Sequence, residues 1–493
     1  MTTHIFTGTA VKEIDRVAIE EFGYDAYGLM TRAGERAYRR IDKYSLDTRS
    51  MLVLCGVGNN GGDGYILASA ALEAGWQVTV YASGTPKTPS ARRALARYVA
   101  AGGEVLEVDD NAIVDFDVAV VVDALLGVGL TTPPRAVVAK LVNLANQSRG
   151  LRVALDVPTG LDADTGEVFE PCFEADKTIT FIDHKFGLMT GPACSYVGNL
   201  SLERLDVEQS LSAIVEYCAA LITKPKLAKR VADSHKGSYG TTVIMGGDVG
   251  MLGAVLLAGA ASLRTGAGKV RIASTSEHLD TPALWMPELM SETLTEDSVS
   301  NLDHADAVAF GPGLGQSAWA RSVFDQVIKL KMPMVLDADG LNLLAIKPSK
   351  APKSNWVLTP HPGEAARLLA CTTSEIQKDR RTAAIMLAQR YNAVVVLKGA
   401  GTLVANPAGR VELCDLGNPG MATAGTGDVL TGIIVALLGR QLPLFDAACS
   451  AVWLHARAAD LQVAQLGEEG LVASDVIHGL AAAFADARVE LGR

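Results

Sequence analysis

The chain has 493 residues, of which 49% are hydrophobic and only 5% aromatic. This length allows two or three domains, and the wealth of Gly, Ala, Val and Leu favours an α/β fold whose parallel strands are buried on both faces. The net charge of −11 argues against nucleic acid or an anionic membrane as the main partner, while small anions in local pockets remain possible.

The cysteines and the apolar runs indicate the cellular setting. Seven cysteines are scattered along the chain without a Cys-x-x-Cys pair, which is typical of a reduced, cytoplasmic protein without structural zinc. The first residues lack the basic and apolar regions of a secretory signal, and no apolar run approaches the ~20 residues of a membrane span. We therefore expect a cytoplasmic protein with no membrane partner.

Residues 9 to 44 are predicted to form two helices. Ala10, Ile14, Val17 and Ala18 recur at helical spacing. Helices of this kind ahead of a sheet pack on the sheet or on a partner subunit, so we assign them no chemistry and expect a homo-oligomer.

A glycine-rich segment follows the first predicted strand, 51–55. Gly56-Val-Gly-Asn-Asn-Gly-Gly-Asp-Gly64 separates this strand from a helix predicted from about Tyr65 to Ala74. The segment matches the dinucleotide fingerprint G-x-G-x-x-G, but the next strand ends in Ala82-Ser-Gly84 and lacks the acidic residue that binds ribose. This disfavours a nicotinamide dehydrogenase and favours a loop that contacts a polar ligand or an ion; a tight polar turn is the alternative.

Two further predicted strands end in aspartate, at Asp123 and Asp156. Ligands of open parallel sheets lie outside the carboxyl ends of the strands, so the loops after residues 55, 123 and 156 are expected to meet in one crevice. A single aspartate of this kind is more often a turn residue, but three converging loops indicate a site. Oxygen atoms of Asn60, Asp123 and the Thr159 region could bind a hard cation there.

The pattern weakens after Glu203, where a helix is possible over 211–221, and we place a domain boundary near residue 215. A second α/β series then begins with a strand over 241–245 and a helix over 254–264. Further strands are predicted over 269–273, 307–310, 333–336, 356–359 and 393–397, and a hairpin turn over 406–409. Alternating strands and helices predict a mainly parallel sheet with its site along one edge.

The segment Asn418-Pro-Gly-Met-Ala-Thr-Ala-Gly-Thr-Gly-Asp428 leads into the apolar run 429–438, which is long enough for a buried helix. Gly425 and Gly427 allow a tight turn whose N–H groups point into one concavity, which favours a phosphate. Asp428 beside that concavity could accept a proton from a hydroxyl group while the N–H groups hold a moving phosphoryl group. The alternative is a glycine-rich turn in which Asp428 caps the helix.

These loops taken together resemble a known family. Residues about 1–215, with Gly58–Gly64, Asp123–Gly129 and Asp156–Asp162, resemble the YjeF N-terminal domain, the NAD(P)H-hydrate epimerase. Residues about 216–493 resemble the ribokinase-like, ADP-dependent NAD(P)H-hydrate dehydratase, through Gly311-Pro-Gly-Leu-Gly315, Thr359-Pro-His-Pro-Gly-Glu364, Lys398-Gly-Ala-Gly-Thr402 and Gly425-Thr-Gly-Asp428. The resemblance implies a bifunctional NAD(P)H-hydrate repair enzyme with a Rossmann-like and a ribokinase-like α/β/α sandwich.

In such an enzyme the first domain interconverts the R and S hydrates of NADH and NADPH, and the second dehydrates the S form with ADP. The resemblance assigns residues to each ligand. Potassium is bound by Asn60, Asp123 and Thr159, and the adenine nucleotide by Lys398, Gly399, Ala400, Gly401, Thr402 and Gly427. The hydrate is contacted in the first domain by Asn59, Asn60, Gly61, Gly62, Asp63, Gly127, Val128, Gly129, Leu130, Thr131, Thr132, Pro133 and Asp156, and in the second by Ala254, Gly313, His361 and Asp428.

The residue chemistry agrees with these roles. Hydroxide is a poor leaving group, and phosphorylation makes its elimination easy, with Asp428 as the base and Mg²⁺ on the phosphates. Glu364 is a weaker candidate for the magnesium shell, His361 is a contact residue and not a base, and Asp156 is the acid–base candidate for epimerisation. Two alternatives stay open: the second domain could be a small-molecule kinase, and the first a non-catalytic binding module.

Overall fold

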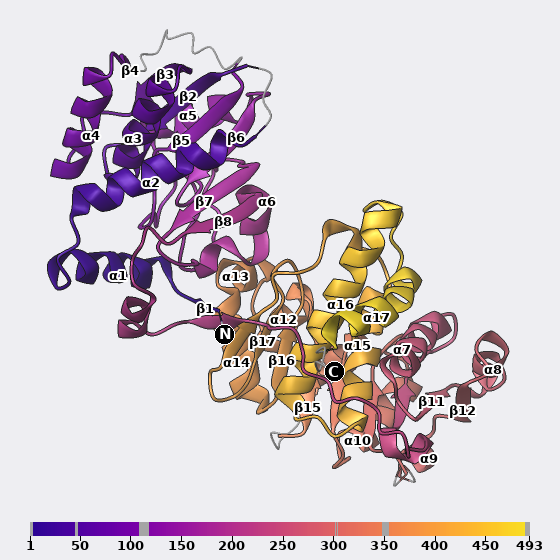
Figure 1. Cartoon of the computed structure of the whole chain (residues 1–493). Coiled ribbons are helices and arrows are strands. Elements are labelled where there is room, and N and C mark those ends of the chain that lie inside the picture. Colours follow the sequence, from indigo (N-terminus) through magenta and orange to yellow (C-terminus); the bar gives the residue numbers. More distant parts are fainter. Residues whose placement is uncertain are drawn as a thin grey trace. The chain divides into compact units, whose positions relative to one another are not determined.

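The computed structural model describes residues 3–44, 48–107, 118–300, 302, 304–347 and 354–488 (Figure 1). The chain divides into two compact units, of which the first ends at Ala219 and the second begins at Ala220. This division lies close to the boundary expected near residue 215. Each unit is an α/β sandwich, as the sequence predicts, and is described by itself.

The described part of the first unit contains a parallel sheet in the order β4–β3–β2–β5–β6–β7–β8. The chain moves outward from β2 in one direction and then, from β5, in the other, which is the doubly wound arrangement. A short β1 precedes the sheet. The strands are β1 (His4–Ile5), β2 (Ser50–Cys55), β3 (Gln77–Ala82), β4 (Val105–Glu107), β5 (Val120–Ala124), β6 (Leu151–Leu155), β7 (Lys177–Phe181) and β8 (Asn199–Glu203).

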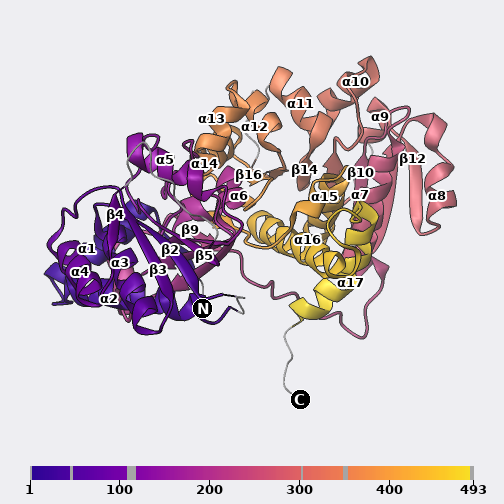
Figure 2. The ribbon, with the colours of Figure 1, turned by 90° about the horizontal axis from the view of Figure 1, so that it is seen from above.

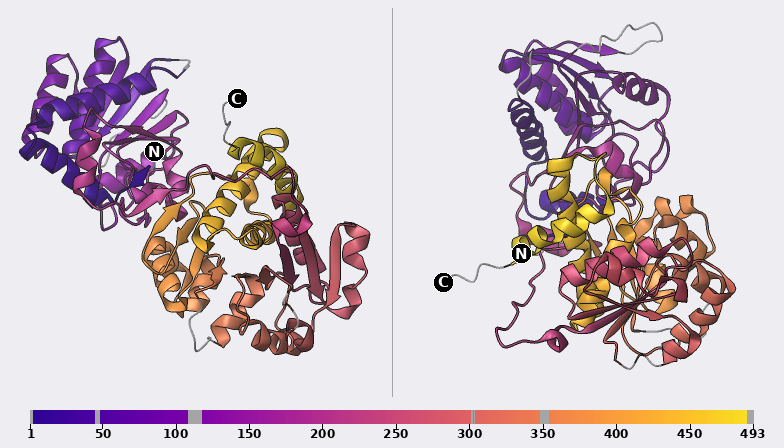
Figure 3. Two further views of the ribbon diagram at one scale, coloured as in Figure 1. Left: turned by 60° about the horizontal axis from the view of Figure 1, so that its bottom comes forward. Right: turned by 90° about the vertical axis from the view of Figure 1, so that its right-hand side faces the viewer.

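Helices cover both faces of this sheet (Figure 3). Apolar side chains of α2, α3 and α4 pack with Met51, Val53 and Cys55, whereas α5 packs with Leu52 and Leu54 on the other face. This alternation along β2 is the two-residue period of a strand buried on both sides. The helices are α1 (Gly8–Glu20), α2 (Ala26–Ile41), α3 (Asn59–Glu73), α4 (Pro89–Ala100), α5 (Ala136–Ala145) and α6 (Cys194–Val197).

The second unit is also doubly wound, in the order β9–β18–β17–β16–β15–β14–β13–β10–β11–β12. Its pairs are parallel except for β16–β17 and β17–β18, and the antiparallel hairpin turns at 406–409 as predicted. The strands are β9 (Ala219–Leu221), β10 (Thr241–Met245), β11 (Lys269–Ser274), β12 (Leu289–Thr293), β13 (Ala307–Phe310), β14 (Met334–Leu336), β15 (Trp356–Leu358), β16 (Val394–Leu397), β17 (Leu403–Ala405) and β18 (Val411–Leu413).

In the second unit α7, α15, α16 and α17 lie on one side of the sheet and α10 to α14 on the other (Figure 2). Every residue of α15 from Val429 to Gly439 is buried, so the predicted buried helix is confirmed. The helices are α7 (Leu252–Thr265), α8 (Thr281–Trp285), α9 (Glu296–Ser300), α10 (Ala318–Val327), α11 (Ala338–Ile346), α12 (Pro362–Leu369), α13 (Thr373–Lys378), α14 (Arg380–Tyr391), α15 (Thr426–Gly439), α16 (Leu444–Leu466) and α17 (Ala473–Ala487).

Helices α7 and α15 pack closely because glycine removes a side chain from their contact. A Cβ added to Gly432 of α15 would lie 2.1 Å from the carbonyl oxygen of Ala258 in α7. Such an approach is available only without a Cβ. The two helices start at the carboxyl edge of the sheet and run to its opposite edge, so this contact fixes how their first turns face the site.

Two sequence expectations are wrong. Helix α3 begins at Asn59 and not at Tyr65, so the predicted loop residues 59–63 form its first turns. The possible helix over 211–221 is instead a 3₁₀ turn at Gln209–Ile214 followed by β9, whose Ala220 and Leu221 pair with β18. Among the described residues, no helix combines the length and apolarity that crossing a membrane requires.

Candidate active sites

The first site lies where the strand order reverses, between β2 and β5. Helix α3 starts directly after β2, and its N-cap Gly58 makes no side-chain capping bond. The first N–H groups of such a helix are free to bind an acceptor. A Cβ on Gly61 would lie 1.9 Å from the carbonyl oxygen of Gly56, and one on Gly56 would lie 1.7 Å from that of Leu125. The glycines therefore allow the loops after β2 and β5 to touch.

Asp123 and Thr159 form a buried pair behind these loops. The Thr159 hydroxyl and backbone N–H donate to the two carboxylate oxygens of Asp123 at 2.8 and 2.7 Å, and Leu125 N–H donates a third bond at 3.0 Å. Burial raises the pKa of Asp123 to about 6, while these donors oppose the shift. A fully buried carboxylate with no basic partner gains from a cation beside it.

Asn60 offers a second oxygen close to this pair. Its side chain is 8% exposed, and both its amide oxygen and its amide nitrogen lack a hydrogen-bond partner. Buried polar atoms are normally bonded, so an orphaned amide indicates a ligand. A Cβ on Gly127 would lie 3.4 Å both from Asn60 Cβ and from Asp156 Oδ2, so Asn60 and Asp156 lie on either side of Gly127. The preceding residue, Leu126, donates its N–H to the Thr159 hydroxyl, which holds this loop in place.

The carboxylate of Asp156 is fixed by a buried lysine that the sequence analysis missed. Lys185 is 1% exposed, and its amino group donates to Asp156 Oδ1 at 2.7 Å, to Thr180 Oγ1 at 2.9 Å and to the Phe181 carbonyl at 3.0 Å. Asp156 has a φ of +65°, a region that non-glycine residues rarely adopt and that is common at functional sites. The side chain of Asp156 keeps 16% exposure and can reach a substrate.

The carboxylates of Asp63 and Asp15 lie close enough to Asp156 for its negative charge to act on them. Burial, then Asp156 and Asp15, raise the pKa of Asp63 well above its usual range. Burial and Asp156 likewise raise the pKa of Asp15 on α1, while Lys185 lowers it. Asp15 lies on a helix to which the sequence analysis assigned no chemistry, and a lone acid on an amphipathic helix gives no signal for it.

The other predicted residues of the first unit belong to the start of α3 and to the loop before α5. The side chain of Asn59 accepts a hydrogen bond from Thr88 at 2.7 Å, and Gly61 and Gly62 are buried in the first turns of α3. Residues 127–133 form an irregular loop before α5 whose last three members are exposed. A substrate contact by this loop stays a prediction.

A partly buried lysine also dominates the second unit. Lys398, at the end of β16, donates to Asp337 Oδ1 at 2.8 Å, and the other oxygen of Asp337 accepts from Thr431 at 2.8 Å. Glu364 Oε2 lies 3.9 Å from the same amino group. Burial lowers the pKa of Lys398, but the negative charges of Asp337, Glu364 and Asp428 raise it by more, so the net shift of the pKa is upward.

His361 and Glu364 form the start of α12. Nδ1 of His361 accepts from Gly363 N–H at 3.0 Å, and Glu364 Oε2 accepts from His361 N–H at 2.8 Å, which is a capping box. Burial and Lys398 lower the pKa of His361, which keeps its ring neutral. The imidazole is 51% exposed, so one face is open to a ligand.

The start of α15 has a backbone that suits the predicted anion cradle, whose binding role stays a prediction. Gly425 is its N-cap in the left-handed region at a φ of +91°, and no side chain caps the helix. A Cβ on Gly427 would lie 3.3 Å from Lys398 Nζ, so the amides and the lysine face one volume. Donors of both kinds suit a phosphate.

Asp428 follows this cradle at the third helical position. Among the described residues its carboxylate accepts no hydrogen bond, so the alternative reading of Asp428 as a helix cap gains no support. Burial, with Asp337 and Glu364, raises its pKa to about 7, and Lys398 opposes the shift. A carboxylate that titrates near neutral pH is suited to general base catalysis.

The remaining predicted residues of the second unit lie on neighbouring loops. A Cβ on Gly313 would be 3.1 Å from Ala254 Cβ, so these two are adjacent. In the loop Lys398–Thr402, the Thr402 hydroxyl donates to the Gly399 carbonyl at 2.8 Å, and Gly399 and Ala400 are exposed. Buried Arg380 donates to the Leu397 and Lys398 carbonyls at 3.2 Å each and supports this loop.

Asp337 and Arg380 are further residues that the sequence analysis did not assign. Asp337 comes at the end of a predicted strand, as Asp123 does, so its place at the carboxyl edge of the sheet could have been predicted from the sequence. Within the described residues, no group of three or more His, Cys, Asp or Glu side chains is arranged to hold a metal ion. The three carboxylates near Lys398 are arranged around its charge.

Both units match known protein families. Residues 242–480 match the family described as NAD(P)H-hydrate dehydratase, and residues 26–187 match the YjeF-related protein N-terminus. The bifunctional NAD(P)H-hydrate repair enzyme Nnr of Escherichia coli K12 is 44% identical over 95% of this chain and 92% of its own length. Nnr of Coxiella burnetii is 41% identical over 97% of this chain and 99% of its own length.

The chain belongs to the family of bifunctional NAD(P)H-hydrate repair enzymes.

The solved structure of a relative matches the second unit of this repair enzyme. The ADP/ATP-dependent NAD(P)H-hydrate dehydratase of Bacillus subtilis, co-crystallised with ATP and Mg²⁺, is 33% identical with a TM-score of 0.50. It covers 53% of this chain, and 95% of its own length is matched. The ribokinase-like fold expected for the dehydratase half is therefore confirmed.

The Lys185–Asp156 pair yields a test in the epimerase half. Lys185→Met removes the one cationic partner that Asp156 has among the described residues, and it leaves Asp15 without the charge that lowers its pKa. We expect R/S interconversion to slow by about 10²- to 10⁴-fold and its pH profile to move to higher pH, because carboxylates without a counter-charge stay protonated longer. Hydrate epimerisation followed by chromatography measures both.

Lys177→Met is the matched control, since Lys177 begins β7, the strand that precedes Lys185, at the opposite edge of the sheet, with its amino group over the Tyr44 ring. Circular dichroism of the isolated variants shows whether both are folded. Full epimerase activity in Lys185→Met would contradict the assignment.

Proposed function

We propose that this protein repairs hydrated nicotinamide cofactors, with epimerisation of the R and S hydrates in the first unit and ADP-dependent dehydration of the S hydrate in the second. The observation that carries the proposal is the arrangement at α15, where an uncapped helix start, Lys398 and a carboxylate with a pKa of about 7 face one volume. Anion donors beside a base are what phosphoryl transfer from a nucleotide to a hydroxyl group requires.

In the dehydratase step Asp428 accepts the proton of the hydroxyl at C6 of the hydrated ring as the hydroxyl oxygen attacks the terminal phosphorus of ADP. The phosphorus–oxygen bond to AMP breaks, and AMP leaves. The ring-nitrogen lone pair then expels the phosphate from C6, and loss of a proton from C5 restores the dihydronicotinamide. The amides of 425–427 and Lys398 hold the negative charge of the moving phosphoryl group.

Magnesium fits this step on the nucleotide phosphates, where it would neutralise charge. Glu364 suits its shell poorly, because both its oxygens already face His361 and one also faces Lys398. The loop Lys398–Thr402, with Gly427, is proposed to bind the nucleotide, and Ala254, Gly313 and His361 the hydrate.

In the epimerase step we assign Asp156 the role of acid and base at the hydrate, with Lys185 as its positioning residue. The expected potassium ion fits the orphaned oxygen of Asn60 and the buried, uncompensated carboxylate of Asp123 with the Thr159 hydroxyl. A bound monovalent cation would stabilise the ionised carboxylate and supply positive charge beside the substrate. The loop 127–133 and residues 59–63 are proposed to contact the hydrate.

We further propose that the enzyme acts on both NADH and NADPH hydrates, is cytoplasmic and forms a homo-oligomer. No disulfide joins any of the seven cysteines, which suits a reducing compartment. Leu284 and Trp285 of α8 are 83% and 48% exposed, and apolar exposure of this kind suits a subunit contact. Light scattering gives the mass in solution, and a monomeric mass would contradict the oligomer.

Asp428→Asn tests the proposed dehydratase chemistry. The amide keeps the size of the side chain but cannot accept the hydroxyl proton, so we expect dehydration to slow by about 10²- to 10⁴-fold. With R hydrate, ADP and magnesium, the unsubstituted enzyme should return reduced cofactor, measured by its absorbance, and the variant should stall with R and S hydrates at equilibrium.

Asp460→Asn is a suitable control, since Asp460 pairs with Asn418 on the neighbouring loop. A near-normal rate in Asp428→Asn would contradict its role as base. Accumulation of a phosphorylated alcohol by the unsubstituted enzyme, in place of reduced cofactor and free phosphate, would instead favour the small-molecule kinase.

Asp123→Asn tests the proposed potassium site. Removal of the carboxylate charge should raise the potassium concentration needed for half-maximal epimerisation by roughly tenfold or more. In the unsubstituted enzyme the potassium response should fade as pH falls through about 6, where Asp123 becomes protonated. Initial epimerisation rates across a potassium series measure both effects.

Asp176→Asn, at an aspartate that pairs with Arg152 at 3.0 Å, provides the control. A normal potassium response in Asp123→Asn would rule this site out.

A further inference from the structure

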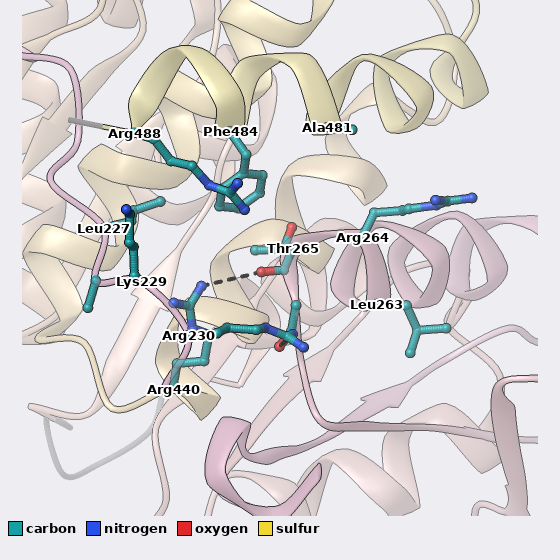
Figure 4. A pocket seen from close by; sticks show the side chains of 12 residues that line it. Leu227, Lys229, Arg230, Leu263, Arg264, Thr265, Arg440, Ala481, Phe484 and Arg488 are labelled. Carbon is teal, nitrogen blue, oxygen red and sulfur yellow. Dashed lines mark hydrogen bonds between the residues drawn. The ribbon is translucent and has the colours of Figure 1, made fainter. Parts of the chain in front are cut away.

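A cavity of about 580 Å³ lies in the second unit, away from the proposed dehydratase site (Figure 4). Residues 227–230, the end of α7 at 263–266, Arg440 after α15 and three residues at the end of α17 line it. Helices α7 and α15 begin at the catalytic loops and end at this cavity. Each has 14 residues, which at 1.5 Å per residue puts the two sites roughly 20 Å apart.

The cavity wall is strongly basic. Five of its twelve residues are cationic and none is acidic, in a chain whose net charge is −11; the five are Lys229, Arg230, Arg264, Arg440 and Arg488. Burial and the charge of Arg230 lower the pKa of Arg440, so the two guanidinium groups lie near enough to repel one another. In Figure 4 Arg488 and Arg230 face the same opening, whereas the guanidinium group of Arg264 points away from them.

Helix capping explains only part of this charge. Arg230 donates to the Gly266 carbonyl at 2.8 Å and Arg440 to the Thr265 carbonyl at 3.4 Å, and both carbonyls belong to the end of α7. Each helix C-terminus carries roughly half a negative charge, so the ends of α7, α15 and α17 together offset about one and a half positive charges. Even without Arg264, which points away, more than two of the positive charges remain. Among the described residues, the side chains of Lys229 and Arg488 make no ion pair or hydrogen bond that would neutralise their positive charges.

The rest of the wall is apolar. Phe484 and Ala481 of α17 face Leu227 and Leu263 across the cavity. Guanidinium groups bind phosphate through paired hydrogen bonds, and an aromatic ring provides a surface for the body of a small molecule. We propose that this basic cavity is a second ligand site, separate from the dehydratase centre, that binds a phosphate-bearing small molecule through Lys229, Arg440 and Arg488.

Isothermal titration of the whole protein with inorganic pyrophosphate tests the proposal. We expect two binding sites in the unsubstituted enzyme, one in the dehydratase centre and one in the basic cavity. In the double variant Lys229→Glu, Arg488→Glu the cavity site should weaken by roughly 10²-fold or more, because two charge-assisted contacts become repulsive. The dehydratase site should remain, and S-hydrate dehydration should continue, which shows that the variant is folded.

The matched control is Lys329→Glu, Lys331→Glu, which makes the same change of net charge at two exposed lysines after α10. It should keep both sites. A single site in the unsubstituted enzyme, two unchanged sites in the cavity variant, or an equal loss in the control would each overturn the proposal.

Discussion

The dehydratase site depends on one partly buried lysine charge among three carboxylates. Lys398 is 20% exposed and bonds directly to Asp337, while Glu364 and Asp428 lie within its field. One cation cannot offset three anions in a partly buried volume, so one carboxylate must hold its proton more tightly. Asp337 has the lysine and Thr431 as donors and Glu364 has the His361 N–H, but Asp428 has no donor among the described residues. The unbalanced charge therefore falls on Asp428, which is the group placed next to the anion cradle.

The epimerase site repeats this arrangement with different residues. Lys185 is buried against Asp156, and Asp15 and Asp63 share the field. In both units the lysine follows a strand, at the carboxyl edge of a doubly wound sheet where loops from several strands meet. The two lysines fix one carboxylate each and leave others with raised pKa values, which is how a fold prepares acids and bases for neutral pH.

The sequence predicted the α/β fold of each unit and most of the strands, because parallel strands buried on both faces give short apolar runs followed by Gly or Asp. It also predicted the glycine turn at 425–427 that starts the buried helix α15, since a glycine-rich turn before an apolar run has a local cause. The start of α3 was missed because the glycines at 61, 62 and 64 resemble a loop, yet they serve here to let loops and helices approach. Lys185 and Asp15 were missed because their roles arise only from burial beside Asp156, 29 and 141 positions away.

The central claim is that charge crowding around Lys398 makes Asp428 a base that titrates near neutral pH. Infrared spectroscopy across a pH series tests this directly, through the band of a protonated carboxyl group that is present in the unsubstituted enzyme and absent from Asp428→Asn. The structure predicts that this band is half-lost at about pH 7. A band already lost by about pH 5, as for an ordinary aspartate, would contradict the account.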